Sequence, residues 1–151
     1  MKTIGLLGGM SWESSIEYYR IINQEVKARL GSLHSAQSLM YSVDFAEIEK
    51  LQHMGDWDAL TQAMIDAAKR LERGGADFLA ICTNTMHRMA PEVAAAINIP
   101  LLHIADATAD AIREKGLNTV GLLGTRQIFS MLIVMIGMII VQLKGHLPED
   151  P

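Results

Sequence analysis

Short apolar runs alternate with longer amphipathic stretches along this 151-residue chain. Residues 3–8 (TIGLLG) are a continuous apolar run ending in glycine, which predicts a buried strand. The following stretch predicts a helix between Ser11 as its N-cap and Gly31 as its C-terminal glycine. Its apolar positions recur at helical spacing: Ile16, Tyr19, Ile22, Val26 and Leu30.

The same alternation continues through the rest of the chain. Asp56 is a helix N-cap by its position, and Gly74-Gly75 ends the helix that it begins. The apolar face of that helix comprises Trp57, Leu60, Met64, Ala68 and Leu71. Further strands are predicted over 37–43, 77–81, 100–104 and 119–124, and further helical segments over 86–97, where Pro91 allows only a first turn or a kink, and over 106–115, ending at Gly116.

Strands that alternate with helices predict an α/β fold, with a mainly parallel sheet flanked by helices. In such sheets ligands bind beyond the carboxyl ends of the strands. Most of the chemically interesting groups of the first 126 residues lie at those ends: Gly8 to Ser11, Asp44, Cys82 to Thr85, His103, and Gly124-Thr125.

Two segments of the chain resemble each other. TIGLLGGM (3–10) and TVGLLGTR (119–126) agree in six of eight positions if Ile and Val are counted as alike. Either two apolar strands agree by chance, or the second segment begins a duplicated α/β lobe.

Composition narrows the classes of partner. Half the residues are apolar and the net charge is −4, with no run of basic residues, so nucleic acid is not expected as a partner. The single cysteine excludes an internal disulfide, and the N-terminus lacks the order of regions found in a signal peptide. These features predict a soluble, cytoplasmic protein.

The segment 128–143 departs from that composition. It has 13 apolar residues of 16 and no charge. A membrane-spanning helix takes about 20 apolar residues, so the length favours a buried element and makes a membrane anchor the alternative.

The glycines of GLLGGMS follow a strand and precede a helix. Gly5, Gly8 and Gly9 do not have the G-x-G-x-x-G spacing of a dinucleotide site. Two interpretations remain: a turn whose N–H groups hold a small anion such as a carboxylate, or a turn that only needs glycine dihedral angles.

Cys82 is the only cysteine, within the stretch ICTNTMH. Free cysteines are commonly buried as small apolar residues. Against that, Cys82 follows a strand end, precedes hydroxyl and amide side chains, and has a helix start just beyond it. A helix N-terminus lowers a thiol pKa and favours the reactive thiolate. Thr83, Asn84 and Thr85 offer hydrogen-bond donors for a carboxylate. The five histidines have no zinc-site spacing, so no metal site is expected.

Five motifs together resemble the aspartate/glutamate racemase family, in particular its broad-specificity amino-acid racemase branch. They are MKTIGLLGGMSWESS, SVDF, ICTNTMH, LLHIADAT and GLLGTR, and the likeness covers residues 1–126. It implies an amino-acid substrate, no cofactor, and two α/β lobes that each supply one cysteine to a site between them. By this likeness Cys82 is an acid/base thiol, whereas Thr83, Asn84 and Thr85 bind the α-carboxylate and amino group. Met10 closes the site, and Gln52, a neutral amide facing the substrate side chain, indicates broad or non-acidic specificity.

The resemblance also implies a division of the chain: a first α/β lobe over 1–118, the start of a truncated second lobe over 119–126, and a divergent apolar tail over 127–151. A second cysteine is expected from the second lobe, and this sequence has none. The leading hypothesis is a cofactor-independent amino-acid racemase. The alternative is a catalytically impaired remnant that binds amino acids or a homologous partner, and a one-cysteine decarboxylase of the same superfamily is a third. A homo-oligomer is compatible with each.

Overall fold

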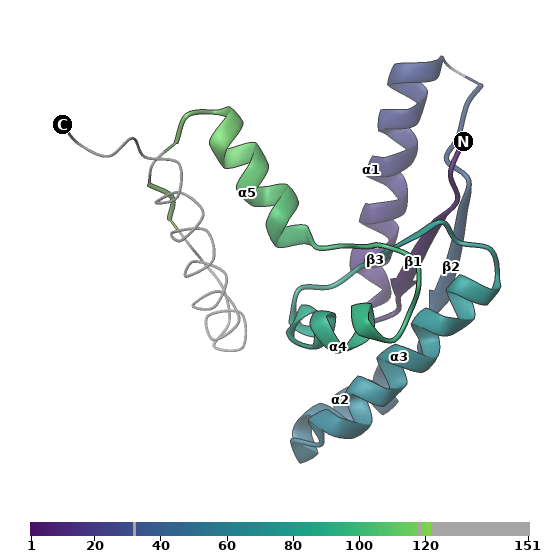
Figure 1. Ribbon diagram of the computed structural model, residues 1–151, viewed down its shortest axis with the longest axis vertical. Helices are drawn as coiled ribbons and strands as arrows, with labels where there is room; N and C mark the ends of the chain where they lie inside the picture. The colour runs from purple at the N-terminus through teal and green to yellow at the C-terminus, as the bar shows by residue number, and fades with distance from the viewer. Residues whose placement is uncertain (32, 118, 122–151) are drawn as a thin grey trace. The chain divides into compact units, whose positions relative to one another are not determined.

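The computed structural model describes residues 1–31, 33–117 and 119–121. The chain divides into two compact units, Met1–His103 and Ile104–Pro151, and each is described by itself. The first unit contains a four-stranded parallel sheet in the order β2-β1-β3-β4 (Figure 1). Its strands are β1 (Ile4–Gly8), β2 (Ser38–Ser42), β3 (Phe78–Ile81) and β4 (Leu101–Leu102). The predicted α/β class with a parallel sheet is confirmed.

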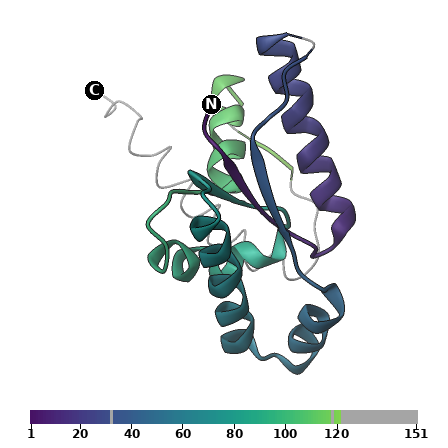
Figure 2. The ribbon, with the colours of Figure 1, turned by 90° about the vertical axis from the view of Figure 1, so that its right-hand side faces the viewer.

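Helices connect the strands and cover both faces of the sheet. They are α1 (Trp12–Leu30), α2 (Phe45–Met54), α3 (Trp57–Arg73), the short 3₁₀ helix η1 (Thr85–Met89) and α4 (Ala90–Ala95). Figures 1 and 2 show α1 on one face and α3 with α4 on the other. Side chains of β1 alternate accordingly. A Cβ added at Gly5 would contact Leu71 of α3, whereas one added at Gly8 would collide with Ser15 of α1.

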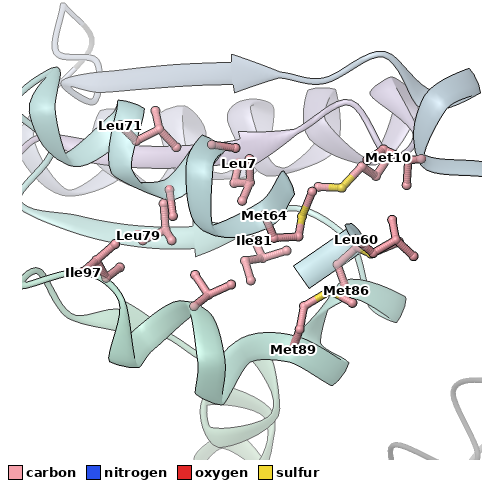
Figure 3. Packing of buried hydrophobic residues seen from close by; sticks show 14 of the residues in the cluster. Leu7, Met10, Leu60, Met64, Leu71, Leu79, Ile81, Met86, Met89 and Ile97 are labelled. Carbon is pink, nitrogen blue, oxygen red and sulfur yellow. The ribbon is translucent and has the colours of Figure 1, made fainter. Parts of the chain in front are cut away.

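The main core lies between the sheet and α3, η1 and α4 (Figure 3). Leu7 of β1 and Leu79 of β3 project onto the apolar face of α3, where Leu60 and Met64 are fully buried. The spacing that predicted this face was right, because residues three and four apart lie on one side of a helix. Asp56 also caps α3 as predicted, since its carboxylate accepts the Ala59 N–H at 3.0 Å.

The helix α1 forms as predicted between Ser11 and Gly31, but its apolar residues are not buried. Ile16 and Tyr19 are each about half exposed (50% and 49%), and Ser15 is the buried residue of this helix. The face of α1 that approaches β1 must be small, because the glycine turn after β1 lies directly against it. Spacing alone identified the helix and not which side meets the sheet.

Several elements differ from their predicted bounds, and one helix was not predicted. The strand predicted over 100–104 is only Leu101–Leu102, because Ile104 already begins α5 (Ile104–Glu114). The helix α2 was missed, although Asp44 caps it by accepting the Ala46 N–H at 3.1 Å. Pro91 lies in the first turn of α4, as predicted.

The second unit contains α5, followed by a turn at Gly116, whose φ of +65° is the left-handed conformation that glycine adopts readily. A strand was predicted over 119–124. Residues 119–121 are not in a strand, and 122–124 lie outside the described residues. The apolar segment 128–143 also lies outside them. Within the described part of the chain, no helix has both the length and the apolar character needed to cross a membrane.

Candidate active site

The structure brings Cys82 and the glycine turn together at the carboxyl edge of the sheet. Cys82 directly follows β3, and its N–H donates to the Leu7 carbonyl of β1 at 2.8 Å. A Cβ placed on Gly8 would lie 3.9 Å from the Cys82 Cβ. The two motifs are 74 positions apart in the sequence, counted from Gly8 to Cys82, and become neighbours because β1 pairs with β3 in parallel.

Two serines of α1 form hydrogen bonds to the glycine turn and to the backbone at Cys82. Ser15 is buried, and its hydroxyl oxygen accepts the Gly9 N–H at 3.0 Å. The Ser14 hydroxyl lies 2.6 Å from the Cys82 carbonyl and 2.9 Å from the Ser11 carbonyl, which share it as acceptors. Sequence reasoning missed both serines. The sequence feature that could have identified them is the pair of small polar residues in the first turns of α1, on the side of the helix nearest the glycine turn.

The Cys82 side chain is fully buried, with 0% of it exposed. Burial raises the pKa of the thiol from about 9 to about 12, because the thiolate loses its hydration. The expectation that a helix N-terminus lowers this pKa is therefore wrong for this structure. Only the five-residue η1 begins beyond Cys82, at Thr85, and so short a helix does not offset the cost of removing the charge from water.

Tyr18 is a further neighbour of the thiol, one helical turn after Ser14. Burial, and the negative charge that Cys82 would carry as a thiolate, raise the pKa of this phenol. The phenol and the thiol therefore both stay protonated at neutral pH. Tyr18 was not among the predicted site residues, because its position in an amphipathic helix looks the same as that of any packing aromatic residue.

The residues after Cys82 form the turn that leads into η1. Asn84 is exposed, whereas Thr83 and Thr85 are partly buried. Asn84 occupies the N-cap position of η1 without a side-chain capping bond, so its amide is not used to begin that helix. The hydroxyl and amide groups expected to bind a ligand thus belong to the three residues that directly follow Cys82.

Met10 and Gln52 lie in different surroundings from each other. Met10 is only 5% exposed and packs in the core cluster near Leu60 and Met64 (Figure 3). Gln52 is partly buried in the last turn of α2, where its carbonyl accepts the Gly55 N–H at 3.1 Å. Among the described residues, the Gln52 side chain makes no hydrogen bond to the turn that follows Cys82.

His87 contacts that turn, and no sequence pattern had distinguished it as a site residue. Its Nδ1 is 2.7 Å from the Thr83 carbonyl, and its ring meets that of His103 edge to face with 4.6 Å between centroids. Burial lowers the pKa of His87 to about 4. Over residues 1–31, 33–117 and 119–121, no group of three metal-ligating side chains comes together.

The chain is similar in sequence to known racemases. The sequence model of the Asp/Glu/hydantoin racemase family matches residues 7–133. The broad specificity amino-acid racemase RacX of Bacillus subtilis (strain 168) is 30% identical over 114 residues, which are 72% of this chain and 48% of that protein. The chain therefore spans about half the length of this curated relative.

Solved structures agree in fold. A candidate Asp/Glu racemase from Yersinia pestis is 58% identical with a TM-score of 0.80, covering 83% of this chain and 55% of that one. An aspartate racemase homologue from Pyrococcus horikoshii OT3 is 32% identical with a TM-score of 0.82, covering 92% and 60%. Aspartate racemase from Picrophilus torridus, at 20% identity and a TM-score of 0.74, shares the fold (97% and 60% covered). On these grounds, the chain belongs to the Asp/Glu/hydantoin racemase family.

Proposed function

We propose that this chain provides one half of a cofactor-independent amino-acid racemase, with Cys82 as one of its two acid/base groups. The observation that carries the proposal is the position of Cys82, which follows a parallel strand, lies beside a glycine turn and precedes three donor side chains. Family membership and the racemase relatives support it.

Racemisation explains why a thiol at this edge is useful. Inverting Cα requires that one group removes the proton from one face and a second group returns a proton to the other. The high pKa of buried Cys82 makes it the protonated partner at neutral pH, able to return a proton to a carbanion. A bound substrate ammonium group would favour the thiolate, because an opposite charge nearby stabilises the charged form. Cys82 would then act as a strong base.

The remaining site residues have proposed roles around that thiol. Thr83, Asn84 and Thr85 would hold the α-carboxylate and amino group, which limits charge build-up in the carbanion. Met10 would close the site, and Gln52 would face the substrate side chain and favour broad or non-acidic substrates. The 151 residues contain one cysteine, so the second thiol would come from another segment or subunit.

The proposed organisation of the chain follows the same reasoning. We propose a first α/β lobe over 1–118, the start of a second lobe over 119–126, and a divergent segment over 127–151. Limited proteolysis followed by mass spectrometry tests these limits, and protected fragments that end near residue 118 are expected. Cleavage inside α3 or β3 at an equal rate would contradict the first boundary.

Proton exchange at Cα tests the function directly. The chain is incubated in heavy water with L-glutamate, L-aspartate or L-homoserine, and deuterium at Cα is followed by NMR. We expect exchange above background in the wild type and its loss in Cys82→Ala and Cys82→Ser. Exchange that survives both substitutions, or that never exceeds background, would refute Cys82 as the acid/base group in this chain.

A second candidate function is binding of amino acids without turnover. The fully buried thiol with its raised pKa favours it, because a thiol that stays protonated and buried when an amino acid binds removes no proton. Calorimetric titration with the same amino acids separates the two. Binding that is unchanged in Cys82→Ala, together with no Cα exchange in the wild type, would support binding alone.

A further inference from the structure

The two peptide groups that follow Cys82 are each held by a side chain from a different element. The Ser14 hydroxyl of α1 donates to the Cys82 carbonyl at 2.6 Å. The His87 ring of η1 donates from Nδ1 to the Thr83 carbonyl at 2.7 Å. Both bonds are short for their type, and they approach the turn from separate parts of the sequence.

The tautomer of His87 follows from its partner. A carbonyl oxygen only accepts, so Nδ1 must carry the hydrogen, and the neutral ring then leaves Nε2 as an acceptor. That Nε2 is buried without a hydrogen-bond partner in the described structure, in a side chain only 2% exposed. An apolar side chain would fill this core position without that penalty. Apart from the ring contact with His103, the contribution that distinguishes imidazole from an apolar side chain is therefore the bond to the Thr83 carbonyl.

Holding a carbonyl also fixes the next N–H. In a trans peptide the C=O of one residue and the N–H of the next point in opposite directions. The bond from Ser14 thus turns the Thr83 N–H away from α1, and the bond from His87 turns the Asn84 N–H away from the buried ring. Neither N–H donates to another residue of the described chain, and Asn84 is exposed.

We propose that His87 and Ser14 are positioning residues, which hold the two peptide planes after Cys82 so that the Thr83 and Asn84 N–H groups are directed at a bound carboxylate. The inference rests on the proposed function for the identity of that carboxylate, the α-carboxylate of an amino acid. Donors that are fixed before the ligand arrives bind it without a further ordering cost.

Paired substitutions at position 87 test the role of Nδ1. In His87→Asn the side-chain amide nitrogen occupies the place of Nδ1, so the donor to Thr83 is kept. In His87→Gln the amide nitrogen lies near the place of Nε2, so that donor is lost while a polar side chain of similar size remains. Ser14→Ala removes the bond to the Cys82 carbonyl, together with the shared bond to the Ser11 carbonyl. Thr61→Ala is its control, because the Thr61 hydroxyl bonds the Trp57 carbonyl at 2.7 Å within α3, away from the turn.

The measurement is ¹⁵N–¹H NMR of the Thr83 and Asn84 amides during titration with acetate, a simple carboxylate, and with L-glutamate. We expect both amides to shift in the wild type, His87→Asn and Thr61→Ala. In His87→Gln and Ser14→Ala we expect roughly tenfold weaker binding, the equivalent of one lost hydrogen-bond donor. Ethylammonium, which has no carboxylate, is expected to shift neither amide.

Far-UV circular dichroism and the melting temperature show whether each variant folds. If His87→Gln or Ser14→Ala does not fold, the ¹⁵N shifts of the wild-type His87 ring still test the assignment of Nδ1 as the protonated nitrogen. A protonated Nε2 would overturn the proposal. So would equal carboxylate binding by folded His87→Asn and His87→Gln, or the absence of an acetate shift in the wild type. Amide shifts with acetate but no Cα exchange would instead refute the proposed function and leave this inference standing.

Discussion

Replacing Gly9 by alanine tests whether the close packing of the glycine turn is as tight as the structure indicates. Gly9 has a φ of +90°, in the region that residues with a Cβ rarely adopt. An added Cβ would lie 2.6 Å from the Val43 N and 2.8 Å from the Ser42 Oγ, and closer still to the Val43 carbonyl oxygen. Two of these three atoms belong to the backbone and cannot rotate away.

The size of the effect follows from these contacts. The unfavourable φ costs about 1–2 kcal/mol for a residue with a Cβ. Forcing the added methyl into a packed site costs about 1–3 kcal/mol more. The total loss in the free energy of unfolding is thus about 2–5 kcal/mol, and it includes any weakening of the bond from the Val43 N–H to the Gly8 carbonyl, now 3.0 Å.

Gly75 provides the matched control. Its φ is +96°, close to that of Gly9, but an added Cβ there would meet no atom within 4 Å. In Gly75→Ala only the unfavourable φ should therefore lower the free energy of unfolding, by about 1–2 kcal/mol. Urea unfolding followed by circular dichroism at 222 nm measures both variants, and the difference between them isolates the clash. If Gly9→Ala is no less stable than Gly75→Ala, the close approach of the turn to Val43 is refuted.

Further outcomes are expected for core truncation, for thiol labelling and for the protonation of His87. Met64→Ala should lower the free energy of unfolding by about 2–5 kcal/mol, whereas Leu33→Ala, at a residue 98% exposed, should change it by less than about 0.5 kcal/mol in urea titrations; equal effects would contradict the assigned core. Iodoacetamide should modify Cys82 at pH 8 only in urea, because the native thiol is buried and has a pKa of about 12, and rapid native labelling would refute this. Between pH 6.5 and 4 the unfolded chain binds a proton at His87 that the folded chain, with a pKa of about 4 there, does not. Stability should therefore fall as the pH falls through this range, and a slope unchanged in His87→Asn would contradict the assignment.

The stability of the protein at high pH should show the opposite behaviour. The pKa of Cys82 is raised in the folded chain, so the folded state keeps a proton that the unfolded state loses above about pH 9. The stability contributed by the neutral thiol is complete below pH 9 and decreases as the pH rises toward 12. Comparing the urea midpoints of the wild type and Cys82→Ala across this range isolates the thiol from other groups that titrate there. Parallel curves would contradict the raised pKa.

Much of the fold was predictable because it depends on local pattern. The strand β1, the face of α3 and the cap at Asp56 each follow from periodicity or from a single capping side chain. The helix α2 and the short β4 were mispredicted, since a ten-residue helix and a two-residue strand leave little periodicity to detect. The half-exposed apolar residues of α1 show the same limit, because spacing does not reveal what covers a face.

The candidate site, like the fold, was predictable only in part. The sequence by itself determined that Cys82 follows a strand end and that Gly8 and Gly9 form a turn, because both are consequences of neighbouring residues in the chain. Only the tertiary structure decided that the thiol is buried and its pKa raised, that Met10 enters the core, and that the His87 ring holds the Thr83 carbonyl. Hydration and hydrogen-bond partners are set by atoms brought together from distant parts of the chain, and no local pattern contains them.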